Sequence, residues 1–376
     1  MDMEAKIIKE RLLSLDVFRG ITVAAMILVN NPGTWESVYS PLLHAHWNGC
    51  TPTDLVFPFF LFIVGVSIHF AFLPVSENGL TRQLFLKILR RSLIIFALGL
   101  FLAWFPVFTL DRLSRLRIPG VLQRISIVFF FSSIIYLSSN WLTHIRIAVS
   151  LLVGYFILMT IVPVPDFGAA NLEPETNLGA WVDRLLLDGH LWAQSKTWDP
   201  EGTLSTLPAI ATCLLGMLSG QLITKVKSAA EKVAWLFFIG SVLILLGLTW
   251  DLIFPINKAL WTSSYVLYTG GIATQFLAAL YWLVDIQGHK KWATPFVYYG
   301  TNAIFVFVVS GILAKTLLRI KVDAEGNISL WSYLYENLYA TWLPPKDASL
   351  LFALSLLALF LVILWQMYKR KIFIKV

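Results

Sequence analysis

Residues 43–74 read LHAHWNGCTPTDLVFPFFLFIVGVSIHFAFLP, and they decide both the fold class and where to look for chemistry. The later part, 53–74, is an apolar run long enough to cross a bilayer core as a helix. The earlier part brings two histidines, an asparagine and a carboxylate to the mouth of that helix. Because polar and titratable groups are costly to keep at such a position, their presence indicates a functional site.

The composition of the whole chain predicts an integral membrane protein. Hydrophobic residues make up 57% of its 376 residues and charged residues 14%, and the mean hydropathy is +0.73. A water-soluble chain of this length would expose too much apolar surface with that balance. The formal charge of +7 does not indicate a nucleic-acid partner, because the basic residues occur in short clusters between apolar runs. The expected partner is the lipid bilayer.

Runs of about 20 apolar residues, the length that crosses a bilayer core, occur ten times along the chain. We therefore predict an all-α polytopic membrane protein in which residues 1–376 form a single transmembrane domain. The predicted spans are 12–31, 53–74, 91–110, 119–139, 145–163, 204–224, 233–254, 260–284, 293–316 and 349–368.

Ten spans place both termini on one side of the membrane. Basic residues are more numerous in the segments on that side, so the positive-inside rule makes it cytosolic and predicts an N-in, C-in orientation. The two long connections, 164–203 and 317–348, then lie on the outer face. Connections of this size could roof a cavity.

A candidate catalytic pair lies in the opening stretch. His44 and Asp54 are ten residues apart across a turn that contains Gly49, so their side chains can approach each other. A carboxylate beside an imidazole fixes its tautomer and raises its basicity, which suits a general base. The alternative is structural: His44 and His46 bond to water and backbone at the interface, while Asp54 caps the second span. The residues alone leave both interpretations open.

Further polar residues occur at the ends of predicted spans or inside them. Asn30 ends the first span at the outer face, and Arg124 lies within the fourth. An arginine inside a span must face a partner or a polar cavity. Arg124 could form a structural ion pair with Asp251 or Asp54, and ligand binding is the alternative.

A basic rim is predicted on the inner side of the membrane. Such a cluster suits phosphate groups, which arginine and lysine bind through charge-assisted hydrogen bonds. Positive charges at span ends also set topology, so the cluster has a second explanation. Its members are Arg19, Arg82, Lys87, Arg90 and Arg91.

Six separated stretches resemble, in order, the signatures of the heparan-α-glucosaminide N-acetyltransferase family, a branch of the transmembrane acyltransferases. The match runs from about residue 12 to the last span, and no single stretch would suffice. The stretches are SLDVFRG (14–20), HAHWNGCTPTDLVFP (44–58), RIPGVLQRI (117–125), DPEG (199–202), NKALWTSSY (257–265) and GTNA (300–303).

The resemblance implies an enzyme that takes acetyl from acetyl-CoA on the cytosolic side and delivers it to the amine of a terminal glucosamine on the other side. The family's catalytic histidine matches His44 rather than His46, and its asparagine at the outer end of the first span matches Asn30. The lysosomal member has an additional N-terminal lumenal region, whereas this chain starts almost directly with the first span. This departure implies a bacterial homologue in the inner membrane.

The implied N-acetylation needs a base for the proton of the attacking amine and a donor for the oxyanion on the thioester carbonyl. We assign His44 as the base or acyl carrier, Asn30 as the donor, and Asp54 as the group that orients His44. The CoA phosphates would rest on basic residues at the inner side, and no metal is expected. The predicted cofactor-binding residues are Arg19, Arg90, Arg91 and Arg124, and the predicted acceptor-binding residues are Asn48, Asp199, Glu201, Asn257 and Lys258.

Two other functions remain open. A secondary transporter for a sugar or an anion would also have many spans and intramembrane charges, although the sequence shows no internal repeat that would support it. An O-acyltransferase of a related branch would modify a surface glycan or a small alcohol. The identity of the acceptor, the choice between direct and covalent transfer, and the formation of a homodimer are also open.

Overall fold

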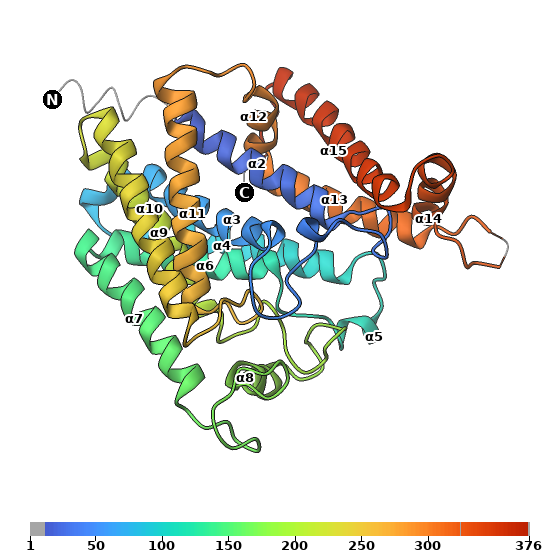
Figure 1. Cartoon of the computed structure of the whole chain (residues 1–376), viewed down its shortest axis with the longest axis horizontal. Helices are drawn as coiled ribbons and strands as arrows, with labels where there is room; N and C mark the ends of the chain where they lie inside the picture. Colours follow the sequence, from blue (N-terminus) through green and yellow to red (C-terminus); the bar gives the residue numbers. More distant parts are fainter. Residues whose placement is uncertain (1–11, 324, 375–376) are drawn as a thin grey trace.

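The computed structural model describes residues 12–323 and 325–374, and it is a bundle of helices (Figure 1). Within these residues no β-strand forms, and only isolated bridges, such as the one between Gly49 and Asn257, pair extended backbone. The predicted all-α fold is therefore confirmed.

The elements fall into three groups. Long helices form the bundle: α2 (Leu13–Asn30), α3 (Val56–Phe72), α4 (Arg82–Trp104), α6 (Val121–Ser138), α7 (Trp141–Thr160), α9 (Thr206–Lys225), α10 (Ala229–Asp251), α11 (Ser263–Leu280), α13 (Ala303–Arg319) and α15 (Pro345–Lys369). Shorter α-helices are α5 (Leu110–Leu113), α8 (Leu178–Leu187), α12 (Thr294–Thr301) and α14 (Leu330–Tyr335). The remaining pieces are the 3-10 segments η1 (Ser40–Leu42), η2 (Pro52–Leu55) and η3 (Leu73–Asn78) and the π-helical segments η4 (Tyr281–Ile286) and η5 (Glu336–Ala340).

Eight of the described helical segments are long and apolar enough to cross a membrane, and α12 with α13 forms a ninth candidate that is bent by 80°. That bend falls inside the predicted span 293–316. The predicted span 91–110 corresponds to α4. The helix begins at Arg82, earlier than predicted, and the prediction missed its first turns because basic side chains interrupt the apolar run there. The protein is thus a polytopic membrane protein, while ten spans and the N-in, C-in orientation stay predictions. Four basic residues behind the orientation lie outside the described residues: Lys6, Lys9, Arg11 and Lys375.

The central helix α3 packs closely against α9. A Cβ atom at Gly65 would lie 1.9 Å from the carbonyl oxygen of Cys213, and one at Gly216 would lie 2.0 Å from the carbonyl oxygen of Phe62. Only glycine fits at these two positions, so the two backbones come close together, which is usual for helix packing in membranes. Besides α9, the helices α6 and α11 contact α3. Because α3 is surrounded by other helices, its sequence shows no polar face.

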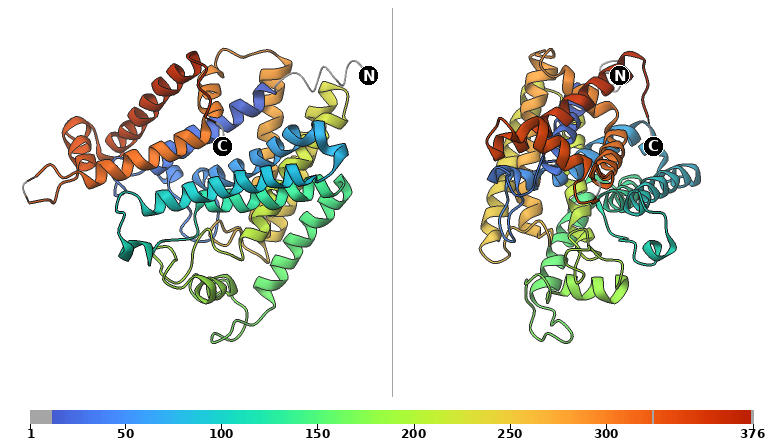
Figure 2. Two further views of the ribbon diagram at one scale, coloured as in Figure 1. Left: turned by 180° about the vertical axis from the view of Figure 1, so that it is seen from behind. Right: turned by 90° about the vertical axis from the view of Figure 1, so that its right-hand side faces the viewer.

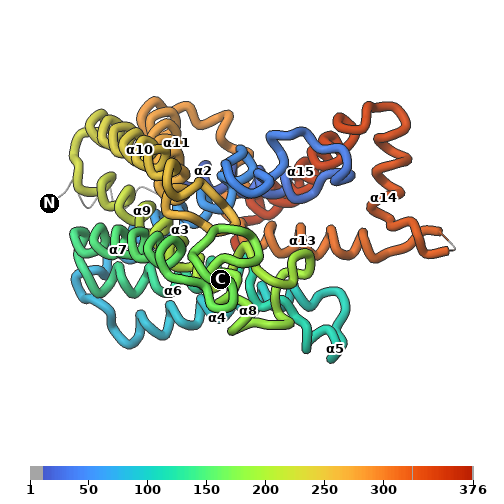
Figure 3. Tube along the Cα trace, turned by 60° about the horizontal axis from the view of Figure 1, so that its bottom comes forward, coloured from blue at the N-terminus to red at the C-terminus, as the bar shows by residue number. Residues whose placement is uncertain are grey.

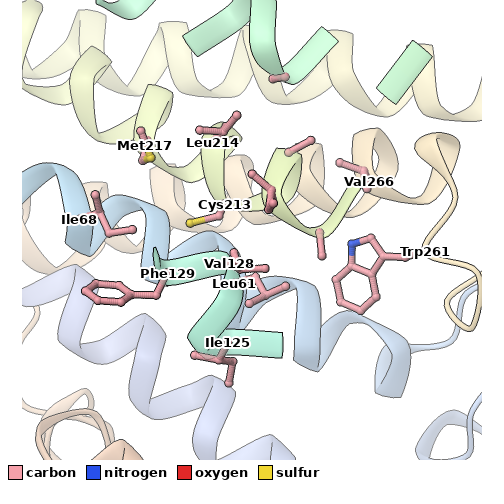
Figure 4. Close-up of a cluster of buried hydrophobic side chains, with 14 of the residues drawn as sticks. Leu61, Ile68, Ile125, Val128, Phe129, Cys213, Leu214, Met217, Trp261 and Val266 are labelled. Carbon is pink, nitrogen blue, oxygen red and sulfur yellow. The ribbon is translucent and has the colours of Figure 1, made fainter. Parts of the chain in front are cut away.

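The main apolar core fills the space between α3, α6, α9 and the start of α11. Figure 4 shows side chains of these helices meeting there: Leu61, Ile68, Ile125, Val128, Phe129, Cys213, Leu214, Met217, Trp261 and Val266. Trp261 closes one end of the core, and its indole N–H donates to the hydroxyl of Thr212 over 3.1 Å. The core thereby fixes the ends of the helices that carry the candidate site.

Three connections gather at one end of the bundle: the loop after α2, the connection that carries α8, and the turn before α11 (Figure 1). Figure 3, in which this end comes forward, shows the green connection next to the gold turn. The Trp47 ring packs on Trp198 with 5.3 Å between centroids, and the Trp47 indole donates to the carbonyl oxygen of Leu172. The connection 164–203 therefore covers the stretch that holds the two histidines.

The other long connection, 317–348, contacts an earlier part of the loop after α2: Trp331 donates its indole N–H to the carbonyl oxygen of Gly33, and the Tyr39 hydroxyl donates to Asp347. It carries α14 at the far end of α13, as Figures 1 and 2 show. Trp331 packs on Phe352 of α15, with 4.8 Å between ring centroids. Of the two predicted outer connections, 164–203 contacts the stretch that holds the two histidines, through Trp47, whereas 317–348 contacts the loop before that stretch.

Candidate active site

Asp54 anchors the loop that carries His44. Its Oδ1 lies 2.6 Å from Nδ1 of His44, and its Oδ2 accepts hydrogen bonds from the backbone N–H of Ala45 and from both the N–H and the hydroxyl of Thr51. Only 1% of the Asp54 side chain is exposed. Thr51 and Asp54 also form a capping box at the start of η2. The predicted contact with His44 and the alternative role as a helix cap are therefore both present.

Lys258 reaches the same imidazole from the turn before α11. Its Nζ lies 3.1 Å from both Nδ1 and Nε2 of His44, and 3.9 Å from Oδ1 of Asp54. An atom at equal distance from both ring nitrogens must lie over the ring face, because in the ring plane it would collide with a ring carbon. Burial lowers the pKa of the Lys258 ammonium. Asp54, His44 and Lys258 thus form one group of charged and titratable side chains.

Asn257 joins the Lys258 turn to the histidine loop. Its Nδ2 donates to Oδ1 of Asn48 over 3.1 Å, while its Oδ1 accepts the backbone N–H of Leu260. Beside this pair, the N–H of Gly49 donates to the carbonyl oxygen of Ile256 over 2.7 Å. Asn257 is 1% exposed. Asn48 and Asn257 are therefore placed so that they hold Lys258 against His44.

A buried ion-pair cluster lies beside this group. Arg117 donates to both carboxylate oxygens of Asp199, over 2.8 and 2.6 Å, and to Glu201 over 2.5 Å. The Asp199 side chain is fully covered, and 9% of the Glu201 side chain is exposed. Although burial opposes it, the two carboxylates raise the pKa of Arg117 above its usual value. From the sequence, Arg117 appears only as the first residue of the stretch 117–125, and this pairing was not predicted.

Arg124 lies behind the cluster and is 1% exposed. Its guanidinium donates to the carbonyl oxygen of Gly202 and to the hydroxyl of Ser205, and it lies 5.1 Å from the centre of the Trp261 ring. Its Nε and one terminal nitrogen have no hydrogen-bond partner in the structure. The ion pair of Arg124 with Asp251 or Asp54, one of the two alternatives that the sequence left open, does not form; a carbonyl oxygen and a hydroxyl take its place.

The reason lies in the chain path around Arg124. The carboxylate of Asp251 instead accepts the backbone N–H of Ile256 over 2.6 Å, and Asp54 is occupied by His44 and Thr51. Arg124 contacts the segment that ends the 164–203 connection, so it holds that segment against the bundle. Cofactor binding by Arg124 stays an untested prediction.

A cavity of about 570 Å³ opens between these groups. Near its mouth it is lined by His44, His46, Asp54, Lys258, Arg117 and Glu201, and by the rings of Trp47, Trp192 and Trp198. Asn30, which is exposed at the end of α2, also belongs to the lining. Deeper in the bundle the walls become apolar, and Thr22 of α2 is a polar member of the lining. Asn48, Asp199, Asn257 and Arg124 are not part of the lining. The cavity thus contacts His44, Asn30, Asp54, Glu201 and Lys258 among the predicted site residues.

Two of the basic residues predicted for the inner side, Arg19 and Arg91, lie near residues that line this cavity. Arg19 precedes Thr22 by one helical turn, and Arg91 precedes the lining residue Ile95 by one turn. The Arg19 guanidinium donates to the Ser67 hydroxyl over 2.7 Å, and it is close enough to Arg91 for the two charges to interact. Arg91 also lies over the Phe129 ring at 4.7 Å. Arg90 is exposed, and among the residues that the structure describes it makes no hydrogen bond or ion pair toward the cavity.

Cys50 lies next to this site but is a poor nucleophile. Burial, helped by the charge of Asp54, raises the pKa of its thiol to about 12. Since the thiolate is the reactive form, Cys50 would carry almost none of it near neutral pH. Cys50 is therefore not a candidate nucleophile.

A second cavity, of about 850 Å³, is larger but does not suit catalysis. It lies between α7, α9, α10 and α11, and its walls are almost entirely apolar. The charged residue in its lining is Lys225 at the end of α9, and the ammonium of Lys225 lies over the ring of Trp141. We therefore take the smaller cavity as the candidate active site.

Two known proteins are similar to this chain over almost its whole length. Heparan-alpha-glucosaminide N-acetyltransferase of Homo sapiens is 30% identical to the chain over 425 aligned residues, which cover 97% of this chain and 60% of the human protein. The Mus musculus protein of the same name is 29% identical over 421 residues, with the same coverage. The chain is homologous to the heparan-α-glucosaminide N-acetyltransferases. No family model matches the chain.

This homology confirms the resemblance inferred from the six stretches. The chain spans 60% of the length of the heparan-alpha-glucosaminide N-acetyltransferases that it matches. Three of the stretches meet at the site: 44–58 supplies His44 and Asp54, 199–202 supplies Glu201, and 257–265 supplies Lys258. A fourth, 117–125, supplies Arg117. Segments far apart in the sequence thus converge on one cavity.

Proposed function

We propose that the protein transfers an acetyl group from acetyl-CoA to the amine of a terminal glucosamine or a related amino sugar. In this proposal acetyl-CoA enters from the cytosolic side and the sugar from the opposite side of the membrane. The observation that carries it is the group of Asp54, His44 and Lys258 at the mouth of the cavity. The names of the human and mouse relatives support the same class of reaction.

His44 is proposed as the general base. Asp54 accepts hydrogen bonds from two backbone N–H groups and a hydroxyl, so it acts as an acceptor toward His44 as well. The ring proton is then on Nδ1, and the lone pair is on Nε2. Because 49% of the His44 side chain is exposed and the residue lines the cavity, an amine can reach Nε2.

Lys258 and Asn30 are proposed to stabilise the oxyanion. Both line the cavity, and the Lys258 ammonium lies against His44. A donor that is already in place where negative charge develops lowers the barrier without reorganising during the reaction. Lys258 thereby takes a role beyond the acceptor binding first expected for it.

The proposed reaction balances without a further reagent. The amine nitrogen attacks the thioester carbon, and the carbon–sulfur bond breaks. His44 takes a proton from the amine and returns it to the departing sulfur, which restores the neutral imidazole. In a covalent variant, Nε2 of His44 would first accept the acetyl group, and the amine would attack afterwards.

The inner part of the site suits the CoA portion of the donor in its chemistry. Met26, Phe60 and Ile304 contribute apolar walls that match an extended pantetheine arm. Arg19 and Arg91, one turn beyond the cavity, offer cationic donors for phosphates. Arg90 is retained in the proposal as a second cation on the same helix.

The outer part of the site suits an amino sugar. The rings of Trp47, Trp192 and Trp198 supply flat apolar surface beside the polar groups, a combination typical of small-ligand sites. The carboxylate of Glu201 lines the same space and can accept hydrogen bonds from an amine. An amine therefore fits better than a hydroxyl group alone. Asp199, which the cavity does not reach, is proposed to act through Arg117 and Glu201.

An acceptor screen with purified protein and acetyl-CoA tests the proposal. Glucosamine and methyl glucosaminide should release free CoA thiol and yield N-acetyl products by mass spectrometry, while glucose should do neither. Acetylation of glucose at a comparable rate would replace the proposal with O-acyl transfer. Uptake of labelled sugar into vesicles without acetyl-CoA would instead support a transporter.

A further inference from the structure

The segment after α15 turns back sharply toward the bundle. The N–H of Lys371 donates to the carbonyl oxygen of Tyr368, and the N–H of Ile372 donates to that of Met367. These two bonds form a Schellman motif, in which the residue at the turn adopts a left-handed conformation. Lys371 has a φ of 55°, so it is the left-handed residue.

A lysine at this position is uncommon. Glycine is the usual residue there, because in the left-handed region the Cβ atom of any other L-residue comes too close to the following carbonyl oxygen. A residue kept against its conformational preference suggests that its side chain has a use. The side chains of Lys371 and its neighbour Arg370 are exposed, so two cations extend from this turn.

Asn302 holds the segment in place after the turn. Its Nδ2 donates to the carbonyl oxygen of Ile372 over 3.2 Å, and its Oδ1 accepts the N–H of Ile374 over 2.8 Å. The side chain therefore pairs with the backbone as a neighbouring strand would. Asn302 is 1% exposed and occupies the bend between α12 and α13. In the right-hand view of Figure 2, the red segment leaves the end of α15 and descends toward the orange helices.

This bend lies at the deep end of the active-site cavity. Ile304, two residues after Asn302, lines the cavity. Gly300, two residues before Asn302, accepts a hydrogen bond from the Arg19 guanidinium over 3.4 Å. The returning segment, residues 370–374, is thus bound to Asn302. Two residues before Asn302 the chain contacts Arg19, and two residues after it the chain lines the cavity.

We propose that the returning segment forms one wall of the entrance for acetyl-CoA, and that Arg370 and Lys371 contact the phosphates of CoA. The fastening by Asn302 gives a role to the stretch 300–303, which the reaction itself does not use. Arg370 and Lys371 are exposed on the segment that Asn302 holds, and Arg19 donates to Gly300, two residues before Asn302. Phosphates bind such cations through charge-assisted hydrogen bonds. The inference rests on the proposed function, because it assumes that CoA is the carrier.

Binding of CoA to the full-length protein in detergent tests this inference without turnover. The double variant Arg370→Gln/Lys371→Gly should weaken CoA binding at low salt by about tenfold for each lost contact, since hydrogen bonds to charged groups contribute roughly 1.5–3 kcal/mol. Glycine preserves the left-handed turn, so the melting temperature should not fall. The matched control Lys227→Gln, at an exposed lysine in the turn after α9, should leave CoA binding unchanged.

Asn302→Ala provides an independent arm. Loss of both hydrogen bonds to the returning segment should weaken CoA binding, and Asn302→Asp, which keeps the acceptor for Ile374, should recover part of it. If the unmodified protein binds no CoA, the proposed function and this inference both fail. If it binds CoA and the double variant binds equally well, the inference alone is overturned.

Discussion

Nζ of Lys258 lies over the imidazole ring of His44, 3.1 Å from each ring nitrogen, although the two residues are 214 positions apart in the sequence. Asp54 holds the same ring in its plane through Nδ1 at 2.6 Å. A base that is oriented by a carboxylate and faced by a cation can take a proton at Nε2 while negative charge develops nearby.

The two cavity histidines should differ sharply in function. His44→Ala removes the proposed base, so kcat for acetyl transfer should fall by about 10² to 10⁴, the usual contribution of general acid–base catalysis. His46→Ala, a control in the same lining, should retain much of the activity, because His46 has no contact with Asp54. Steady-state rates with saturating acetyl-CoA and glucosamine measure both. Equal losses would remove the assignment of His44.

Replacing Lys258 should affect the chemical step more than binding. Lys258→Met keeps the length of the side chain but removes the charge, so kcat should drop by about 10² to 10³, as for loss of one oxyanion donor. The KM for acetyl-CoA should change little, since its phosphates bind far from this residue. Lys258→Arg should restore part of the rate. A change in KM with constant kcat would show that Lys258 binds the acceptor instead.

The carboxylates of Asp199 and Glu201 should have separable effects. Asp199→Asn leaves Arg117 with one buried partner fewer, so the protein should lose about 3 kcal/mol of stability, as expected for a broken buried pair. Glu201→Gln changes a group that lines the cavity, so it should raise the KM for the amino sugar with a smaller drop in melting temperature. Thermal melts and acceptor KM values for both variants decide the matter. The opposite pattern would place Asp199 in the acceptor site.

Asp183 should make stability depend on pH. Burial raises its pKa to about 6, although Thr203 donates its N–H to the carboxylate. The folded state therefore binds a proton more tightly than the unfolded chain, whose carboxyl titrates near 3.9. The contribution of Asp183 to the free energy of unfolding is fully present below about pH 4. It is lost as the pH rises toward 6, and the loss amounts to roughly 1 to 3 kcal/mol.

The comparison of variants isolates that effect. Asp183→Asn should abolish the decline in melting temperature between pH 4 and 6, whereas Asp188→Asn, at an exposed site in the same connection, should retain it. Parallel curves for the protein and the Asp183→Asn variant would show that Asp183 does not titrate in this range.

Local sequence was sufficient for part of the site. The contact of His44 with Asp54 follows from a short loop with a turn at Gly49, and Asn30 was placed correctly at the end of a helix that lines the cavity. Lys258 was singled out, but its contact with His44 was not predicted. That contact depends on how α11 packs against α3, and a packing arrangement of two distant helices leaves no periodic signal in either one.

The fold shows the same division between local and distant information. Apolar runs predicted most of the helices, because the length of a run reports directly on the bilayer. The start of α4 was missed where basic residues interrupt the run, and the 80° bend at Asn302 was missed because no proline or glycine pair marks it. Arg124 was expected to meet a carboxylate, yet the chain offers it a carbonyl and a hydroxyl group.

The most direct test of the account uses the protein in sealed proteoliposomes. Acetyl-CoA with a labelled acetyl group is supplied on the side where α15 ends, glucosamine is supplied on the other side, and the labelled product is measured in each compartment. The account predicts labelled N-acetylglucosamine on the glucosamine side, formed by the protein but not by the His44→Ala variant. Equal product formation by that variant, or consumption of acetyl-CoA without an N-acetylated sugar, would contradict it.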